Sequence, residues 1–531
     1  MKKKGISLIV LIVTIIVMII LAAVVVLTIT NNNPIDNAKK AVFKEDVITY
    51  QDELAIYISN EYSTLQGKRD KKITTKDSDE ILNYIKDLKE SYKGKFCIIE
   101  DQLTYMGDDD TEKRICGELN IPIFVEDIYA GDLSKGGKYD GSKEKPYKLN
   151  CIEDLITWSN NYNIYEEKYI ELERSLDFKS VFSYNDYTTV KYGDLNKDGK
   201  IESILDELTS NNGFTPIYRF SGVFNGNGNE IKNIYIRASV NAAFVNILSG
   251  EVNNLQLSGN IETTSQKYCG GICAISNNAI VSNCINRSNI IGKDAVGGIV
   301  GYGNGKIENC KNYGNINSSG FSGGIVGFNQ SGSGTMSINN CYNEGVIEAS
   351  NISGGIFGIV SDKIAIYNCL NNGKVLSQNY AGGILGCSMR GEIHIINCFN
   401  KEDIEATNAA GGIVGAYVCY YMSTIPLEIL NCFNVGNINC DPNSGAIIGY
   451  EGGHSKNDDS YTINYNYYLE NSAKFAISAF TDNIQKCTKE YMQSNEFVNE
   501  LNNNIKNIVI SDSNILLNEW TYMANNYPSF K

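Results

Sequence analysis

Histidine and proline are scarce in this chain of 531 residues, which holds 7 prolines and two histidines, His394 and His454. The two histidines lie far apart in unrelated sequence contexts, so His-based catalytic triads and His-rich metal sites have little material. The sequence has no C-x-x-C pair, which disfavours a cysteine-based zinc site. Together these absences argue against much ordinary hydrolase and metalloenzyme chemistry.

Basic residues are also in deficit, because 46 lysines and arginines stand against 61 acidic residues and give a formal charge of -15. That balance disfavours contact with a phosphate backbone, so we expect no nucleic-acid partner. The chain does contain 43% apolar residues, 49 glycines without a collagen-like period, and abundant Asn and Tyr. This composition favours strands and turns, and the length allows a large core in more than one domain.

The amino terminus carries the longest apolar stretch of the chain. Residues 6–30 form an uncharged run of 25 residues, enough for a helix to cross a hydrocarbon core about 30 Å thick. Residues 1–5 form a basic leader with three lysines, which favours a cytoplasmic amino terminus. We therefore expect a transmembrane helix, with the bulk of the chain from residue 31 onward outside the cytoplasm.

The segment "KKKGISLIVLIVTIIV" resembles the amino terminus of type IV prepilins, a basic leader ending in Gly followed by a hydrophobic helix. The resemblance implies a prepilin peptidase that cuts after Gly5 and leaves Ile6 as the first mature residue. It also implies packing against other pilin-like subunits. This family has Glu at the fifth mature position, where this chain has Val10, so the pairing carboxylate is missing and filament assembly is in question.

Residues 31–135 predict a small α+β region behind the membrane segment. Apolar residues recur with a rough helical spacing over 38–62 and again over 78–92, which indicates a stem helix and a second helix. The stretch "KFCIIEDQLTYMG" predicts two short strands around a turn at Glu100 and Asp101. The acidic run at 108–110 reads as a solvated loop rather than a cation site.

A tandem repeat occupies much of the second half of the chain. Each unit closes a strand-like segment on Asn-Cys and later opens an apolar segment on Gly-Gly, or on Gly-Ala in the last unit. The distance from each cysteine to the next such glycine is 13 residues in all six units, whereas the return distance varies from 13 to 21 residues. The glycines are Gly297, Gly323, Gly354, Gly382, Gly411 and Gly445. Half of the unit is therefore fixed in length, and the other half carries a variable loop.

A unit of this length, with short β-rich pieces and no amphipathic helix, predicts one coil of a right-handed parallel β-helix over residues 223–470. We expect about three strands in each coil. Stacked coils bring one sequence position into a ladder, so the cysteines should pack as small hydrophobes in the core, as Leu255 and Ile234 would in earlier coils. The thiol ladder comprises Cys284, Cys310, Cys341, Cys369, Cys398 and Cys432.

Disulfides between coils have poor geometry, and Cys269 and Cys273 are the strongest candidates for an exception. The asparagine before each ladder cysteine should form a second ladder that satisfies backbone groups at a corner. Its members are Asn283, Asn309, Asn340, Asn368, Asn397 and Asn431.

These units resemble the GLUG motif, a Gly-rich repeat of bacterial surface and secreted proteins, most closely in "GGIVGYGNGKIENCKNYGNI" at 297–316. The lead-in, residues 136–222, resembles the same family through "GSKEKPYKLNCIEDLITWSN", "YIELERSLDF" and the start of "FSGVFNGNGNEIKNIYI". The resemblance implies a β-helix at a bacterial cell surface and names no ligand. Residues 471–531 lose the repeat, so we expect them to cap the open end of the solenoid.

One short motif in the lead-in resembles a calcium-binding loop, "GDLNKDGKIES" within the candidate loop 194–205. Asp194, Asn196 and Asp198 stand at alternate positions, and Glu202 could add an oxygen ligand for Ca²⁺. The twelfth position is Leu205 instead of a bidentate Glu, so an Asp/Asn-Gly surface turn is the alternative.

We expect a membrane-anchored, surface-displayed β-helix protein that binds a carbohydrate, matrix or cell-wall component and is not an enzyme. The longest insertion, "AYVCYYMSTIPLEIL", is the most apolar loop, so Tyr420 and Tyr421 are candidate ligand contacts. Two alternatives stay open: a minor pilin or pseudopilin in a type IV-like filament, and a polysaccharide lyase or glycoside hydrolase built on the β-helix. No catalytic residues can be assigned, because the acidic residues of the repeats fall at different offsets.

Overall fold

The chain divides into two compact units, Met1–Ile128 and Tyr129–Lys531. The computed structural model describes residues 34–64, 73, 75, 77–99, 101–107, 109–119, 121, 139–178, 213–330, 332, 334–418, 426–441, 443–452, 461–477, 484–510, 512 and 515–530. Among these residues, no helix is both long enough and apolar enough to span a bilayer. Residues 1–30, with the predicted membrane segment and the processing residues Gly5 and Ile6, lie outside the described residues.

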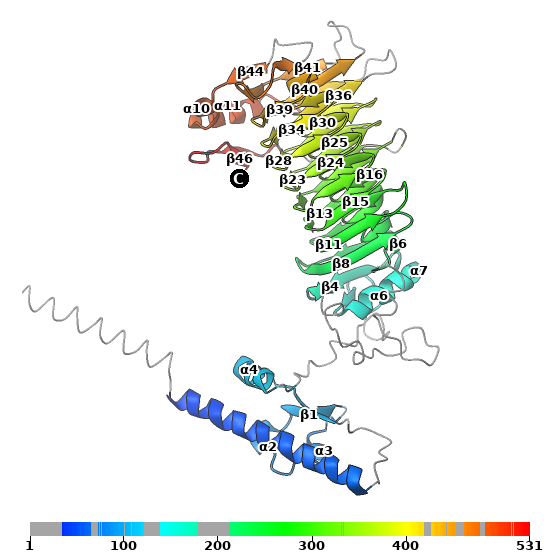
Figure 1. Ribbon diagram of the computed structural model, residues 1–531, viewed down its shortest axis with the longest axis vertical. Coiled ribbons are helices and arrows are strands. Elements are labelled where there is room, and N and C mark those ends of the chain that lie inside the picture. Colours follow the sequence, from blue (N-terminus) through cyan, green and yellow to red (C-terminus); the bar gives the residue numbers. More distant parts are fainter. Residues whose placement is uncertain are drawn as a thin grey trace, which may run out of the picture. The chain divides into compact units, whose positions relative to one another are not determined.

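The first unit contains the predicted stem helix, α2 (Pro34–Thr64), and a hairpin of β1 (Phe96–Ile99) and β2 (Gln102–Tyr105) (Figure 1). The hairpin turns through Asp101, whose φ of 74° is the left-handed conformation of a tight turn. A further helix, α4 (Asp110–Glu118), follows the hairpin. The core of this unit is aromatic, with Phe43 of α2 lying 6.1 Å, centroid to centroid, from Tyr105 of β2.

The helix predicted over 78–92 is wrong in its length. The structure has a short helix, α3 (Ser78–Ile81), and a separate 3₁₀ turn, η1 (Glu90–Tyr92). Ile85 and Leu88 between them are buried, as the periodicity required, but they reach the core through turns. The apolar spacing over 78–92 therefore reflects burial of these side chains in the core and not one continuous helix.

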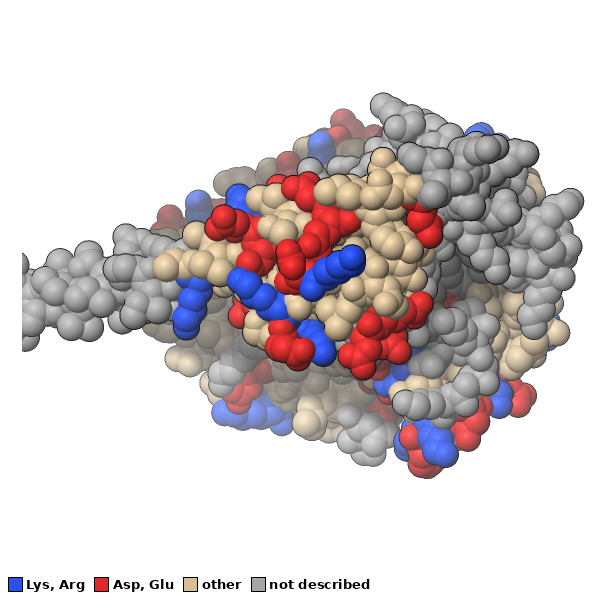
Figure 2. All heavy atoms as spheres, turned by 90° about the horizontal axis from the view of Figure 1, so that it is seen from below, with Lys and Arg blue, Asp and Glu red and all other residues tan. Residues whose placement is uncertain are grey.

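The surface of the first unit carries charges of both signs. Figure 2 shows acidic and basic side chains side by side on the nearest face. Lys89 pairs with Asp46 at 2.6 Å, and Lys95 pairs with Glu112 at 2.8 Å. These pairs are only partly exposed, with Asp46 at 15% and Glu112 at 17% side-chain exposure.

The second unit is a parallel β-solenoid of about eight turns, which confirms the predicted solenoid architecture. Figure 1 shows the strands stacked as successive rungs. Each full coil holds five short strands, more than the three predicted, because Gly and Asn corners break the chain more often. One coil consists of β18 (Lys311–Asn312), β19 (Ile316–Ser318), β20 (Phe321–Gly323), β21 (Val326–Asn329) and β22 (Met336–Asn339). The next coil repeats them as β23 (Tyr342–Asn343), β24 (Ile347–Ala349), β25 (Ile352–Gly354), β26 (Phe357–Val360) and β27 (Ile364–Tyr367).

The predicted thiol ladder forms in the core of the solenoid. All six ladder cysteines are at most 1% exposed, and Leu255 and Ile234 are buried in the same core. Every cysteine among the described residues is a free thiol, so the exception predicted for Cys269 and Cys273 is wrong. These two residues sit on consecutive strands, β12 (Cys269–Gly270) and β13 (Cys273–Ser282), where each pairs with a neighbouring coil. Burial raises the pKa of the Cys284 and Cys310 thiols well above the usual range for cysteine.

The predicted asparagine ladder also forms, at a corner that we call the Asn corner. Its residues have φ between 52° and 60°, the left-handed conformation that Asn tolerates better than most residues. Their amides bond from coil to coil, as where Asn309 Nδ2 donates to Asn283 Oδ1 at 3.1 Å and Asn340 Nδ2 to Asn309 Oδ1 at 2.7 Å. The exception is Asn368, whose Nδ2 donates to Asn339. The same conformation recurs at Asn254, one coil earlier.

A second ladder, the buried Asn ladder, lies two residues after the cysteines and was not predicted. Its members are 0% exposed, and each donates through Nδ2 to Oδ1 of the next at 2.7 or 2.8 Å. Each Nδ2 also donates to a backbone carbonyl two residues ahead, as Asn343 does to Gly345 at 3.0 Å. The members are Asn286, Asn312, Asn343, Asn371, Asn400 and Asn434. Their amides are satisfied inside the core, which is the condition for burying them.

The paired glycines form the tight bend that faces this ladder. A Cβ added to Gly354 would overlap the carbonyl oxygen of Phe357, three residues ahead in the bend. A Cβ added to Gly355 would overlap the Gly383 carbonyl oxygen and the side chain of Asn371. The first glycine therefore permits the bend, and the second makes room for the buried Asn ladder.

The described strands of the lead-in belong to the solenoid sheet, beginning with β3. β3 (Tyr147–Leu149) pairs with β4 (Tyr169–Leu172), and β4 pairs with β7 (Val223–Asn225), all in parallel. Between β3 and β4, helix α6 (Ile152–Asn160) buries Trp158, which lies 5.0 Å from Phe220 and Phe224. A helix thus packs its indole against the first coils of the core, and it is followed by the short helix α7 (Tyr162–Tyr165).

The described residues between 484 and 530 form a segment that we call the C-terminal strap. β44 (Ile484–Cys487) extends the last coil by pairing with β42 (Asn466–Leu469). The rest is expected from sequence to cap the end, yet it packs along the flank of the upper coils (Figure 1). Its remaining elements are α10 (Lys489–Met492), α11 (Asn495–Ile505), β45 (Trp520–Thr521) and β46 (Ser529–Phe530). The strap covers an aromatic stack in which Phe399 and Phe433 lie 4.0 Å apart.

Candidate ligand-binding surfaces

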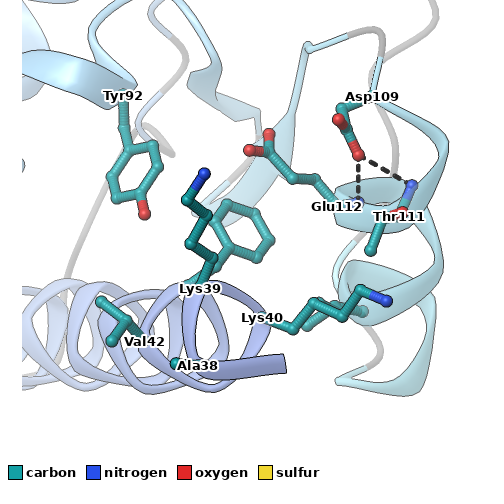
Figure 3. Close-up of a pocket in the computed structure, with 10 residues that line it drawn as sticks. Ala38, Lys39, Lys40, Val42, Tyr92, Asp109, Thr111 and Glu112 are labelled. Atoms are coloured by element: carbon teal, nitrogen blue, oxygen red, sulfur yellow. Dashed lines mark hydrogen bonds between the residues drawn. The ribbon is translucent and has the colours of Figure 1, made fainter. Parts of the chain in front are cut away.

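Two grooves and one polar cluster are the candidate sites among the described residues. The groove in the first unit has a volume of about 900 Å³ and lies between α2, α4 and Tyr92 (Figure 3). Asp109 accepts hydrogen bonds from the backbone N–H groups of Thr111 and Glu112 at 2.8 and 2.9 Å, which caps α4. Glu112 in turn bonds to Lys95 and to the Tyr105 hydroxyl. The two carboxylates that line this groove are therefore already engaged in hydrogen bonds within the first unit.

The second groove runs along the solenoid over five successive coils and has a volume of about 530 Å³. Its floor is made of small side chains at one repeat position. The floor residues are Ser318 of β19, Ala349 of β24, Ser377 of β29 (Val375–Ser377) and Ala406 of β34 (Ile404–Ala406). Parallel pairing in register places these side chains one above another, at the strand spacing of about 4.8 Å. We call this feature the small-residue groove.

Side chains that are polar on every rung but one, where Leu376 stands, line one edge of the small-residue groove. Asn317, Glu348, Leu376, Glu405 and Asn439 follow one another in register, the last on β39 (Ile438–Asn439). Asn317 Nδ2 donates to Glu348 at 3.2 Å, and Lys374 pairs with Glu405 at 2.6 Å. The opposite edge carries Ser350, Gln378 and Thr407. This edge-and-floor arrangement offers hydrogen-bond donors and acceptors at regular intervals to a ligand that lies along the solenoid axis.

A row of half-buried aromatic side chains runs across another face. Tyr268 and Tyr302, the latter on β17 (Val300–Glu308), stack with ring centroids 4.3 Å apart and an interplanar angle of 8°. Phe328 on β21 continues the row 5.6 Å from Tyr302. The Tyr302 hydroxyl donates to Gln330 at 3.1 Å. Because the rings pack against one another, stacked for Tyr268 and Tyr302 and edge to face for Phe328, this row behaves mainly as cross-strand packing rather than as a free stacking platform.

His394 lies in a polar cluster that was not predicted from the sequence. Adjacent strands β32 (Ile393–Ile396) and β37 (Leu427–Leu430) place its Nδ1 2.7 Å from Glu428 and its Nε2 2.7 Å from Glu392. Lys363 pairs with Glu392 at 2.8 Å. The bond to Glu428, opposed by partial burial and reinforced by Glu392, raises the pKa of His394. The carboxylates occupy both ring nitrogens, so the imidazole acts as a structural bridge.

We predict that His394→Gln removes the part of the free energy of unfolding that protonated His394 contributes at low pH. The raised pKa means that the folded state binds the proton more tightly, so the stabilisation is complete below about pH 6.5, the unfolded pKa, and is lost as pH rises through the folded pKa. The difference between wild type and variant in free energy of unfolding should be about 1 kcal/mol at pH 5.5. Urea unfolding from pH 5 to 9 measures this difference. The prediction would be refuted if the free energies of unfolding of the two proteins changed with pH in parallel.

The predicted calcium ligands and the two candidate ligand-contact tyrosines lie outside the residues that the structure describes. Asp194, Asn196, Asp198 and Glu202 of the calcium candidate lie outside the described residues. Tyr420 and Tyr421 of the long insertion lie outside them too. Within the part of the chain that is described, no group of three or more His, Cys, Asp or Glu side chains is arranged to hold a metal ion.

Comparison with known proteins gives little further identification. No family model matches the chain, and no curated protein matches it, so the GLUG resemblance rests on the repeat residues alone. A crystal structure from Bacteroides ovatus, described as that of a "putative immunoglobulin A1 protease", matches with a TM-score of 0.40 and 19% sequence identity. The match covers 74% of this chain and 95% of that chain. A likeness of this degree carries no argument about activity.

Proposed function

We propose that this protein is a surface-displayed binding protein and that its small-residue groove holds an extended glycan. The observation that carries the proposal is the register of the groove, which repeats a small floor residue on four consecutive rungs and a polar edge residue on three of them, with Leu376 on the other. A polymer lying along the axis would meet equivalent groups about every 4.8 Å. Hydroxyl-rich chains suit an edge of amides, carboxylates and hydroxyls, which can both accept and donate hydrogen bonds.

Display at the surface is the second part of the proposal. The uncharged run at 6–30 is inferred to anchor the chain in a bacterial membrane, with the solenoid on the outer side. The solenoid is inferred to be right-handed. Binding of Ca²⁺ by the loop at 194–205 remains a prediction from the sequence. Mass spectrometry of the mature amino terminus tests the anchor: a chain beginning at Ile6 supports prepilin-type processing, and an intact Met1 supports a simple membrane helix.

A glycan array probed with the anchored protein in detergent tests the groove. We expect wild type to retain extended glycans and Glu348→Ala to bind the best of them about tenfold more weakly, since one charge-assisted bond is lost. Glu470→Ala removes an exposed carboxylate outside the groove and should bind as wild type does. Absence of any glycan binding would refute the proposal. Release of new reducing ends or unsaturated products would show instead that the solenoid is an enzyme.

A further inference from the structure

The C-terminal strap shows how the Asn corner can hold a polypeptide. Asn368 Nδ2 donates to the Leu516 carbonyl at 2.9 Å, and its Oδ1 accepts from the Asn518 backbone N–H at 2.9 Å. One coil further, Asn397 Nδ2 donates to the Asn518 carbonyl at 2.9 Å. Asn431 Nδ2 donates to the Leu501 carbonyl at 3.2 Å. Asn368 and Asn397 therefore bond to the backbone of one short extended stretch, 516–518, whereas Asn431 bonds to the backbone of helix α11.

The strap stops partway along this ladder. Asn368, Asn397 and Asn431, which it covers, are at most 1% exposed. Asn309 and Asn283, at the same position of earlier coils, are exposed and bond to each other without a covering chain among the described residues. The amide ladder is interrupted between the two groups, because Asn368 Nδ2 donates to Asn339. The last contact of the strap is the bond from Asn518 Nδ2 to Asn340 Oδ1 at 3.0 Å. The exposed Asn corner is thus the direct continuation of an interface that already holds polypeptide backbone.

The side chains around the exposed Asn corner differ from those under the strap. Under the strap, the position before the corner asparagine is apolar or aromatic, as at Tyr367 and Ile396, and these residues pack against the strap. Around Asn283 and Asn309, over 280–287 and 305–313, the chain instead carries three cations and one carboxylate. The cations are Arg287, Lys306 and Lys311, and the carboxylate is Glu308.

The three cations are exposed, and none forms an ion pair with a described residue. Arg287 lies over the ring of Tyr313, with its guanidinium carbon 4.4 Å from the ring centroid. That contact holds the guanidinium beside the corner while its N–H groups can still donate to an anion. A local excess of positive charge on a chain with a formal charge of -15 is complementary to a negatively charged partner.

We propose that the exposed Asn corner binds an extended, acidic polypeptide segment. Asn283 and Asn309 would bond to its backbone as Asn368 and Asn397 bond to the strap. Arg287, Lys306 and Lys311 would pair with its carboxylates. The corner amides supply the preference for a polypeptide and the cations supply the preference for acidic side chains. This surface is separate from the small-residue groove, so the two proposals can fail independently.

Binding of fluorescent poly-L-glutamate to the whole protein tests the proposal, because this polymer has a peptide backbone and stays extended through self-repulsion. Wild type should bind it in low salt, and binding should weaken as salt is raised. Lys306→Ala with Lys311→Ala should weaken binding about tenfold or more. Asn283→Gly with Asn309→Gly removes both amides while glycine keeps the left-handed corner, and it should weaken binding by a similar factor.

Two controls separate this site from general charge attraction. Lys293→Ala removes an exposed cation between β15 (Asn289–Gly292) and β16 (Ala295–Gly297) of the same coils, and it should bind as wild type does. Polygalacturonate carries the same charge on a sugar backbone and should bind less tightly than poly-L-glutamate. Equal binding of the two polymers, an unaffected asparagine variant, or no binding by wild type would each overturn the proposal. Unchanged thermal unfolding of the variants shows that they remain folded.

Discussion

Replacing Gly355 with alanine should cost the solenoid about 4 kcal/mol or more in free energy of unfolding. The added methyl would overlap both the Gly383 carbonyl oxygen of the next coil and the buried Asn371 amide. Neither group can move away from the methyl. The Gly383 carbonyl belongs to a tight bend, and the Asn371 amide is bonded to Asn343 and Asn400 at 2.8 Å. Chemical denaturation followed by circular dichroism measures the loss, and hydrogen exchange should show it centred on these coils.

Gly332→Ala is the matched control for this substitution. Gly332 has a φ of 85° and nothing within 4 Å of an added Cβ, so alanine there meets only backbone strain. That strain costs about 1 kcal/mol. If Gly355→Ala were no more damaging than Gly332→Ala, the close approach of backbone to the buried Asn ladder would not be what the second glycine provides.

Replacing Trp520 with alanine should detach much of the C-terminal strap and cost about 3–5 kcal/mol. The indole is 2% exposed, lies 5.0 Å from Phe433 and 4.1 Å from Phe530, and donates through Nε1 to Asn397 at 2.6 Å. Its loss opens a large cavity and leaves a buried amide oxygen without that donor. Limited proteolysis and hydrogen exchange over residues 489–530 report detachment directly.

Two variants calibrate this result. Trp520→Phe keeps a ring but loses the Nε1 bond, so it should be intermediate. Tyr522→Ala removes an aromatic side chain that is 41% exposed in the same strand region, and it should change stability by less than about 0.5 kcal/mol. A strap that stays protected in Trp520→Ala would mean that the apolar contacts of α11 suffice to hold it.

Sequence spacing predicted the solenoid well because stacking forces a repeat to keep its register. A cysteine that recurs 13 residues before a glycine must occupy one ladder, and the structure places Cys341 and Gly354 accordingly. The corner asparagines were predictable for the same reason, since few other residues tolerate a φ near 54°. The signal for the buried Asn ladder is also present in the sequence, as Asn at the second position after each ladder cysteine in N-C-x-N.

Contacts between distant segments left no comparable signal. Nothing periodic connects Asn518 with Asn340, which are 178 residues apart, so the flank position of the strap could not be read from the chain. The contact of His394 with Glu428 is different, because each stands four residues before a ladder cysteine and the repeat register therefore places them side by side. The small-residue groove was hidden for another reason: small floor residues such as Ala349 look like ordinary strand residues until the coils are stacked.

The fixed half of each unit has an evolutionary consequence. The residues from Cys341 to Gly354 carry β23, β24 and β25, including the groove floor at Ala349, and every length change falls in the other half. Duplication of one whole unit would therefore insert a rung without disturbing its neighbours, and it would extend the groove by about 4.8 Å. Gene-level gain or loss of units would then tune how long a stretch of ligand is held, while the variable loops stay free to diversify.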